Sequence, residues 1–188
     1  MAVLVIAGSG RGAGKTAVGC ALIAAMPEWQ WVAVKISPHA HQVPEAGLIW
    51  EETDRGSDKD TERYLAAGAA QAFLVSGVHD DDAQTALAAI RRTSGAGSLL
   101  VESNQVVPAL VAQAAEPTLT LAIVAGPQSN WKPSIWPRLD SADAVVLSAG
   151  LTPDQLSPKL HGKRIFCLPR GQWMSPELRM FVRESLRV

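Results

Sequence analysis

The sequence lacks the features that mark several large classes of protein. Its 17 basic and 18 acidic residues leave a net charge of −1, so it has no excess of positive charge for binding nucleic acid or an acidic membrane surface. It has only two cysteines, Cys20 and Cys167. Each lies in an apolar run, which favours buried thiols in a reducing compartment over a disulfide framework. No apolar run approaches the roughly 18 to 20 residues that a membrane-spanning helix needs, and we expect a cytoplasmic protein.

Charged and aromatic residues are also scarce. Charged residues make up 19% of the chain and apolar residues 47%, a balance that favours a globular core over disorder. The length of 188 residues predicts one domain over residues 1–188. Aromatic residues reach only 5%, yet six of them are tryptophans. Trp131, Trp136 and Trp173 lie in segments rich in proline or glycine. We expect these three at a subunit or partner surface, with burial against the core as the alternative.

Short apolar runs alternate with longer, alanine-rich segments along the chain. The runs predict strands at residues 2–7, 31–36, 71–76, 98–102, 119–125, 144–148 and 165–168, and helices at 15–26, 58–67, 83–92 and 176–186. The first run is apolar throughout, which is typical of a strand buried on both faces of a parallel sheet. Strands separated by helices predict right-handed crossovers, and therefore an α/β fold with a doubly wound, mostly parallel sheet and helices on both faces.

A glycine-rich loop lies between the first predicted strand and the first predicted helix. Backbone N–H groups that surround a phosphate chain require glycine conformations, and a helix N-terminus, a lysine and a hydroxyl for Mg²⁺ complete such a site. The loop therefore predicts a P-loop nucleotide-binding fold. We expect Lys15 to be the catalytic lysine on the outer phosphates. The predicted nucleotide-binding residues are Gly8, Ser9, Gly10, Arg11, Gly12, Ala13, Gly14, Lys15, Thr16 and Ala17.

The spacing of this loop differs by one residue from the usual G-x-x-x-x-G-K-[ST] pattern. That pattern would place its first glycine at position 9, where the chain has Ser9, and the glycine is instead Gly8. The longer spacing resembles that of dethiobiotin synthetase and the cobyrinic acid amide synthases. The signature lysine of the MinD and ParA relatives is absent, since Gly10 and Arg11 occupy its positions.

Three further residues at strand or helix ends extend the predicted site. Lys35 ends the second strand, and a side chain there points into the crevice where ligands of such sheets lie. Glu102 follows the apolar fourth strand, and its carboxylate is the kind of ligand that Mg²⁺ needs beside the Thr16 hydroxyl. Asp60, at the start of a helix, is a third candidate for the metal or its waters. We therefore predict a magnesium site at Thr16, Asp60 and Glu102.

Two histidines follow Lys35 in an extended polar stretch. His39 and His41 are two residues apart, so in an extended segment they lie on one side and could share a ligand. Without a nearby cysteine or third histidine they make a weak zinc site. We expect them, together with Lys35, on the substrate side of the nucleotide.

The segment from residue 58 to 71 resembles the MobB family, adaptor proteins of molybdopterin-guanine dinucleotide biosynthesis. That family carries K-H-T-H-H after the second strand and then K-D-S-x-x-L-x-x-A-G-A. The matching residues are Lys35, His39, His41, Lys59, Asp60, Leu65, Ala67, Gly68 and Ala69. Ile36-Ser37-Pro38 interrupts the first block, and Ser103 replaces the glycine of the family's V-E-G. The resemblance covers the first four predicted strands and fades after them.

The resemblance implies a function as well as a fold. A MobB-like protein would bind GTP with Mg²⁺ and support attachment of a guanine nucleotide to molybdopterin. It would work as a homodimer with a MobA-like nucleotidyltransferase partner. The sequence shows no obvious water-orienting residue, so any GTP hydrolysis would be slow unless a partner or second subunit completes the site.

The identity of the base stays open at this point. Many GTP-binding relatives read guanine with N-K-x-D after a late strand, and here the corresponding segment is Ser148-Ala149-Gly150-Leu151. Residues 165–170 could contact the base through backbone groups instead. GTP is therefore preferred by resemblance alone, and ATP is the alternative nucleotide. The chief alternative function is an ATP-dependent ligase or kinase like dethiobiotin synthetase, with Lys35 binding a small carboxylate substrate. A regulatory nucleotide switch without a substrate is a third.

Overall fold

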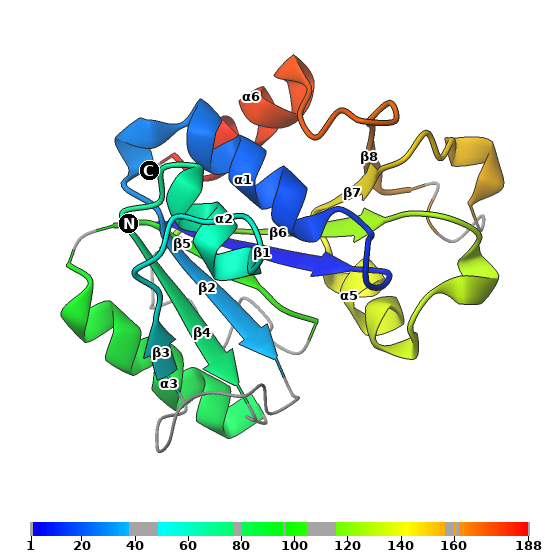
Figure 1. Ribbon diagram of the computed structural model, residues 1–188. Coiled ribbons are helices and arrows are strands. Elements are labelled where there is room, and N and C mark those ends of the chain that lie inside the picture. The colour runs from blue at the N-terminus through cyan, green and yellow to red at the C-terminus, as the bar shows by residue number, and fades with distance from the viewer. Residues whose placement is uncertain are drawn as a thin grey trace.

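The computed structural model describes residues 2–37, 49–76, 80–95, 97–104, 116–156, 160 and 162–187. The strands in these residues form one eight-stranded sheet in the order β3-β4-β2-β5-β1-β6-β7-β8 (Figure 1). The strands are β1 (Val3–Gly8), β2 (Val32–Ser37), β3 (Ile49–Glu51), β4 (Gln71–Ser76), β5 (Leu99–Glu102), β6 (Thr118–Val124), β7 (Ala144–Leu147) and β8 (Arg164–Cys167). Every neighbouring pair is parallel except the edge pair β3 and β4. The predicted α/β fold with a mostly parallel sheet is confirmed.

Helices cover both faces of this sheet (Figure 1). They are α1 (Lys15–Ala25), α2 (Asp60–Ala66), α3 (Asp80–Thr93), α5 (Trp136–Ser141) and α6 (Pro176–Ser185), joined by the short 3₁₀ turns Pro27–Trp29, Gln128–Asn130, Pro133–Ile135 and Pro153–Gln155. α1, α2 and α6 pack on one face. α3 packs against β2, β4 and β5 on the other face, and α5 packs there against β6 and β7. No helix among the described residues is long and apolar enough to cross a bilayer.

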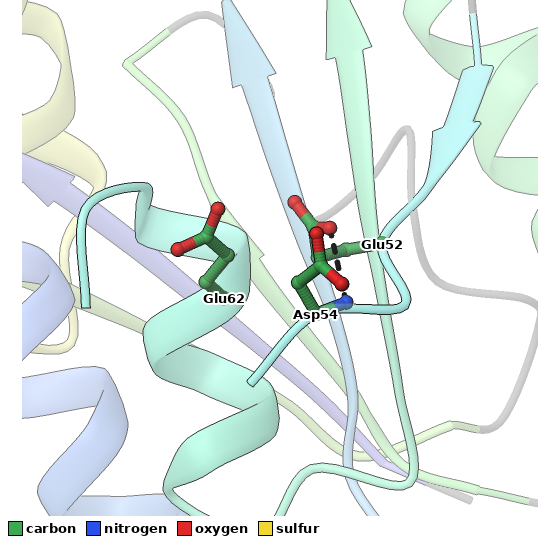
Figure 2. A group of neighbouring side chains, drawn as sticks. All are labelled: Glu52, Asp54 and Glu62. Carbon is green, nitrogen blue, oxygen red and sulfur yellow. Dashed lines mark hydrogen bonds between the residues drawn. The ribbon is translucent and has the colours of Figure 1, made fainter. Parts of the chain in front are cut away.

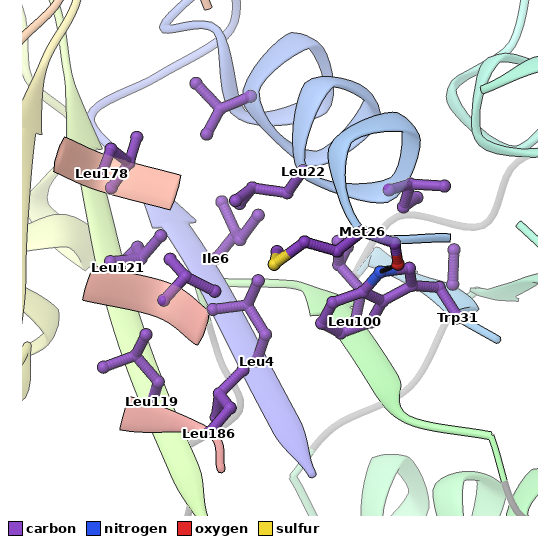
Figure 3. Packing of buried hydrophobic residues seen from close by; sticks show 14 of the residues in the cluster. Leu4, Ile6, Leu22, Met26, Trp31, Leu100, Leu119, Leu121, Leu178 and Leu186 are labelled. Carbon is purple, nitrogen blue, oxygen red and sulfur yellow. Dashed lines mark hydrogen bonds between the residues drawn. The ribbon is translucent and has the colours of Figure 1, made fainter. Parts of the chain in front are cut away.

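β1 shows why a continuous apolar run belongs at the centre of the sheet. Alternate side chains of a strand point to opposite faces. Leu4 and Ile6 therefore enter the core beneath α1 and α6, whereas Val3 and Val5 enter the core beneath α3. Figure 3 shows part of the first core, including Leu4, Ile6, Leu22 and Trp31. With both faces covered, all six residues of β1 are buried.

Three elements differ from the sequence prediction. β3 lies between the predicted strand 31–36 and the predicted helix 58–67, and a three-residue strand is too short to show a pattern. α5 lies in a proline-rich segment for which no helix was predicted. A proline at the start of a helix is tolerated, because the first N–H groups have no partner within the helix. α3 begins at Asp80, three residues before the expected start at 83.

Two expectations about single side chains are wrong. Trp131, expected at a surface, is only 6% exposed, and its indole Nε1 donates to the carbonyl oxygen of Ala125 at 3.0 Å. Its loop folds back over the sheet, which hides the ring. Cys167, expected to be buried, is exposed because β8 is an edge strand in which only Phe166 is buried. Cys20 is half-buried, and burial raises the pKa of its thiol to about 11.

Candidate functional site

The glycine-rich loop connects the end of β1 to the start of α1 at the carboxyl edge of the sheet. Gly14 is the N-cap of α1 and has a φ of 95°, and Gly12 has a φ of 78°. Both angles favour glycine. No side chain caps the helix, so the N–H groups of its first turn, which a helix leaves without internal partners, are available to an anion. Lys15, Thr16 and Ala17 form that turn.

Gly8 and Ser9 explain the unusual spacing of the loop. A Cβ atom at Gly8 would lie 2.5 Å from Cγ of Lys15, so the stem of the lysine passes where a side chain would otherwise stand. Ser9 is buried, and its hydroxyl oxygen accepts a hydrogen bond from the N–H of Ala125 at 3.1 Å. The glycine is therefore required at position 8, and position 9 ties the loop to the end of β6.

Lys15 reaches across the loop. Its Nζ donates to the carbonyl oxygen of Gly10 at 2.9 Å and lies 3.9 Å from Oε1 of Glu102. Burial lowers the pKa of Lys15, an effect that the negative charge of Glu102 opposes. Arg11 is exposed. The lysine ammonium therefore lies between the loop backbone and a carboxylate, where the outer phosphates of a bound nucleotide would gain most from it.

Glu102 is the centre of the site. It is 1% exposed and is the last residue of β5, which lies beside β1. Its Oε2 accepts hydrogen bonds from the hydroxyl of Thr16 at 2.8 Å and from the hydroxyl of Tyr64 at 2.6 Å. Its Oε1 accepts one from Nζ of Lys35. A buried carboxylate would be costly without such partners, and here each oxygen has at least one.

Asp60 joins the same cluster from the first turn of α2. Its Oδ2 lies 3.0 Å from Nζ of Lys35. Burial alone would raise the pKa of Asp60, but the charge and hydrogen bond of Lys35 and a hydrogen bond from Thr16 outweigh it, so the pKa is lowered. Burial alone would likewise lower the pKa of Lys35, but Glu102 and Asp60 together raise it. Both residues therefore remain charged at neutral pH.

The three residues predicted for the metal, Thr16, Asp60 and Glu102, thus come together in one cluster with Lys35, which was predicted on the substrate side. One hydroxyl and two carboxylates are the hard oxygen donors that Mg²⁺ prefers. The ammonium of Lys35 bridges the two carboxylates, so the cluster already stabilises a positive charge at this point. The donor set fits a magnesium ion bound beside phosphates.

Two residues of the site were not predicted from the sequence. Tyr64 is fully buried and contacts Gly19 of α1, where a Cβ would lie 2.9 Å from its ring. Asn104 accepts a hydrogen bond from the N–H of Gly8 and donates one to its carbonyl oxygen, both at 2.8 Å. The sequence signal that could have found both residues was their spacing from a predicted site residue. Tyr64 lies four residues after Asp60 on the same helix face, and Asn104 lies two residues after Glu102.

The other side of the loop is held by neutral groups. The hydroxyl of Ser148, after β7, donates to the carbonyl oxygen of Ala13 at 2.7 Å. The N–H of Lys132 donates to the carbonyl oxygen of Ser9 at 2.8 Å. Trp173, from the segment between β8 and α6, packs on Gly14. Beside these contacts lies a cavity of about 370 Å³, lined by Gly126, Pro127, Gln128, Ala149, Gly150, Leu151 and Gln155.

His39 and His41 lie outside the described residues. Residues 165–170, expected near the base, cover most of β8 and the turn after it. The N–H of Leu168 donates to the carbonyl oxygen of Leu147, and the N–H of Gly150 donates to the carbonyl oxygen of Leu168. These bonds bring the segments after β7 and β8 together.

A second group of carboxylates lies away from the loop, between β3 and α2 (Figure 2). Glu52, Asp54 and Glu62 each place an oxygen within 4.8 Å of the others. Lys59 lies 3.1 Å from Glu62 and 3.7 Å from Glu52, and the N–H groups of residues 53 and 54 donate to Oε1 of Glu52. Internal partners are therefore present for Glu52 and Glu62, and we interpret the group as the anchor of the chain that enters α2.

Comparisons with known proteins bear on the fold. No protein-family model matches the chain, and no curated protein sequence matches it. The chain is similar to the crystal structure of HypB from Helicobacter pylori in complex with nickel, with 17% identity and a TM-score of 0.57 over 98% of this chain and 89% of that one. It is also similar to the Signal Recognition Particle 54 kDa protein from Aeropyrum pernix K1 in complex with GDP, with 12% identity and a TM-score of 0.47 over 98% and 46%. The likeness to HypB supports the fold.

Proposed function

We propose that the chain is a single-domain P-loop protein that binds GTP with Mg²⁺ and supports molybdopterin guanine dinucleotide biosynthesis. The observation that carries the nucleotide site is the meeting of Lys15, Thr16 and the buried Glu102 beneath the glycine-rich loop. A lysine for the outer phosphates, a hydroxyl and a carboxylate for the metal are the groups that such a site requires.

Each residue has a distinct role in this proposal. The loop from Gly8 to Gly14 would bind the phosphates through its N–H groups, and Lys15 would neutralise the outer ones. Thr16 and Glu102 would hold Mg²⁺, with Asp60 on the ion or its waters. The ion would balance the phosphate charges and polarise the phosphate oxygens. Lys35 would turn from the carboxylates toward an anionic group of the second substrate.

The finer parts of the proposal rest on the resemblance to the MobB family. They are the guanine base, molybdopterin as the second ligand, the MobA-like nucleotidyltransferase partner and the homodimer. The resemblance depends on Lys35, on Lys59-Asp60 at the start of α2 and on Glu102 at the end of β5. We expect hydrolysis of GTP to be slow in the isolated protein.

One specific observation favours a second candidate, an ATP-dependent ligase or kinase like dethiobiotin synthetase. The segment after β7, residues 148–151, has no carboxylate to accept the N–H groups of guanine. Lys35 lies beside the phosphate site, where it could also bind a small carboxylate substrate. ATP in place of GTP would then be the nucleotide.

Thermal unfolding with ATP and GTP, each with and without Mg²⁺, tests both candidates. A nucleotide at about 100 times its dissociation constant should stabilise the protein by roughly 2.7 kcal/mol. Lys15→Ala should abolish this stabilisation, because it removes the cation from the phosphates. Arg179→Ala, which removes an exposed cation of α6, is the matched control and should retain it. Stabilisation by neither nucleotide, or full stabilisation of Lys15→Ala, would contradict the P-loop assignment.

The second ligand separates the two candidates. Molybdopterin-type compounds should raise the unfolding temperature further if the proposal is right. A preference for ATP together with turnover of a carboxylate substrate would favour the ligase or kinase instead.

A further inference from the structure

Trp173 lies directly against the glycine-rich loop. A Cβ atom at Gly14 would be 2.5 Å from Cζ3 of its ring, so the ring occupies the space beside the residue that precedes Lys15. The indole is only half-buried, and part of it packs on the core beneath α1 and α6. It forms no hydrogen bond within the described part of the chain. A large aromatic surface is thus held next to the loop and left partly open.

The segment that carries Trp173 is fixed in place. The N–H of Leu168 donates to the carbonyl oxygen of Leu147 at 2.7 Å, which ties the end of β8 to β7. The N–H of Gln172 donates to the carbonyl oxygen of Pro169 at 3.0 Å, and the turn is completed by Gly171 with a φ of 82°. These contacts fix the backbone immediately before the ring that lies beside Gly14.

The other tryptophans show why this one is distinctive. Trp31 and Trp131 are buried, and their indoles donate to backbone carbonyls. Trp29 is stacked on Trp31. Trp50 is on the edge strand β3, and Trp136 begins α5 on the opposite face of the sheet from α1.

We propose that Trp173 stacks on the base of the nucleotide whose phosphates the loop binds. This inference rests on the proposed nucleotide site. The phosphates lie at the N-terminus of α1, and the nucleoside must extend from them along the carboxyl edge of the sheet. The segments after β7 and β8 meet there. The segment after β7 uses Ser148 to hold Ala13, and residues 148–151 supply no charged group to read a base.

Stacking has a consequence for specificity. Every base presents an aromatic face, so stacking adds affinity without distinguishing one base from another. With no carboxylate in residues 148–151, Trp173 should bind adenine and guanine nucleotides about equally. Discrimination between them would have to come from the second substrate or a partner protein.

Inorganic tripolyphosphate provides the test, because it has the phosphates of a nucleotide and no base. Isothermal titration calorimetry would measure the affinity of the wild-type protein, Trp173→Ala and Trp173→Phe for tripolyphosphate, ATP and GTP, all with Mg²⁺. Trp173→Ala should weaken both nucleotides roughly ten- to hundredfold and leave tripolyphosphate unchanged. Trp173→Phe should retain most of the nucleotide affinity. Trp50→Ala, which removes an exposed ring on the edge strand β3, is the matched control and should change none of the three.

The outcomes separate the inference from the function beneath it. If the wild-type protein bound neither tripolyphosphate nor a nucleotide, the nucleotide site itself would be overturned. Normal binding of all three ligands by Trp173→Ala would overturn only the role of Trp173. An equal loss for tripolyphosphate and nucleotides would show that the ring merely supports the loop. If Gln128→Ala, and not Trp173→Ala, weakened the binding of nucleotides but not of tripolyphosphate, the base would lie in the neighbouring cavity that Gln128 lines.

Fluorescence keeps the inference testable even if Trp173→Ala does not fold. GTP should quench the tryptophan fluorescence of the wild-type protein and tripolyphosphate should not, because only a base can stack on the indole. The quenching should disappear in Trp173→Phe. Equal quenching by GTP in the wild-type protein and in Trp173→Phe would overturn the inference.

Discussion

The two sides of the glycine-rich loop are held by different kinds of contact. On the side of β5 and β2 the contacts are between charges. Lys15 and Lys35 face Glu102 and Asp60, and Glu102 is almost completely buried. On the side of β6, β7 and β8 the contacts are neutral, and Ser148, the N–H of Lys132 and the ring of Trp173 hold the loop.

The difference follows from what each side would have to bind. A metal ion and phosphates need charges of both signs held in a fixed arrangement. A base is uncharged and needs hydrogen bonds or an aromatic surface. The charged side therefore supports the phosphate and metal roles, and the neutral side supports contact with the nucleoside. Removing one residue from each side should have unequal effects on stability.

Glu102→Ala should have the largest effect. It leaves the hydroxyls of Thr16 and Tyr64 without their acceptor and the ammonium of Lys35 with Asp60 alone, and breaking a buried ion pair on one side is strongly destabilising. We expect the free energy of unfolding to fall by about 3 kcal/mol, somewhat less than for a fully enclosed pair because Lys35 can reach solvent. Urea denaturation monitored by circular dichroism measures this loss.

Glu28→Ala is the matched control for that loss. Glu28 also pairs with a cation, Arg183, but both side chains are 40% or more exposed. Exposed ion pairs contribute little, so the expected change is within about 0.5 kcal/mol. Equal losses for the two variants would mean that the cluster around Glu102 has no special role in stability, and the contrast between the two sides would fail.

Ser148→Ala tests the neutral side and should have a smaller effect. Its hydroxyl is buried and donates to the carbonyl oxygen of Ala13, so the variant leaves a carbonyl without that donor. We expect a loss of about 1 kcal/mol, measured in the same urea experiment, and an unchanged dependence of nucleotide binding on Mg²⁺. Ser129→Ala, at an exposed serine, should change neither. A loss of Mg²⁺ dependence in Ser148→Ala would show that the two sides are coupled.

The sequence predicts the charged side much better than the neutral side. Lys35 and Glu102 each occupy a strand end after a buried apolar run, and parallel strands bring such ends to one edge of the sheet. The position of Asp60 follows from the resemblance to a known family. These signals are local, so a single sequence is enough to show them.

The neutral side depends on contacts between distant segments, which no local pattern records. Ser148 and Ala13 are 135 residues apart, and Trp173 reaches Gly14 from the distant segment between β8 and α6. Trp131 was expected at a surface because its loop is rich in proline, yet that loop folds over the sheet and buries the ring. β3 and α5 were missed for local reasons, since β3 has only three residues and α5 begins with a proline in its first turn.

Asp60→Asn should have the smallest effect: it lowers stability slightly at neutral pH, and the difference from the wild-type protein disappears in acid. The folded pKa of Asp60 is lowered, so its ionised form stabilises the fold above the ordinary carboxyl pKa near 3.8, and that contribution is lost as the pH falls through the lower folded value. Its side chain is 36% exposed, which limits the contribution to less than about 1 kcal/mol. Between about pH 5 and pH 3, the wild-type protein should therefore lose slightly more stability in urea than Asp60→Asn does. Asp140→Asn, an exposed residue of α5, should follow the wild-type curve. If stability changed with pH by the same amount in all three proteins, Asp60 would not contribute to the charged cluster, and Glu102 alone would hold Lys35.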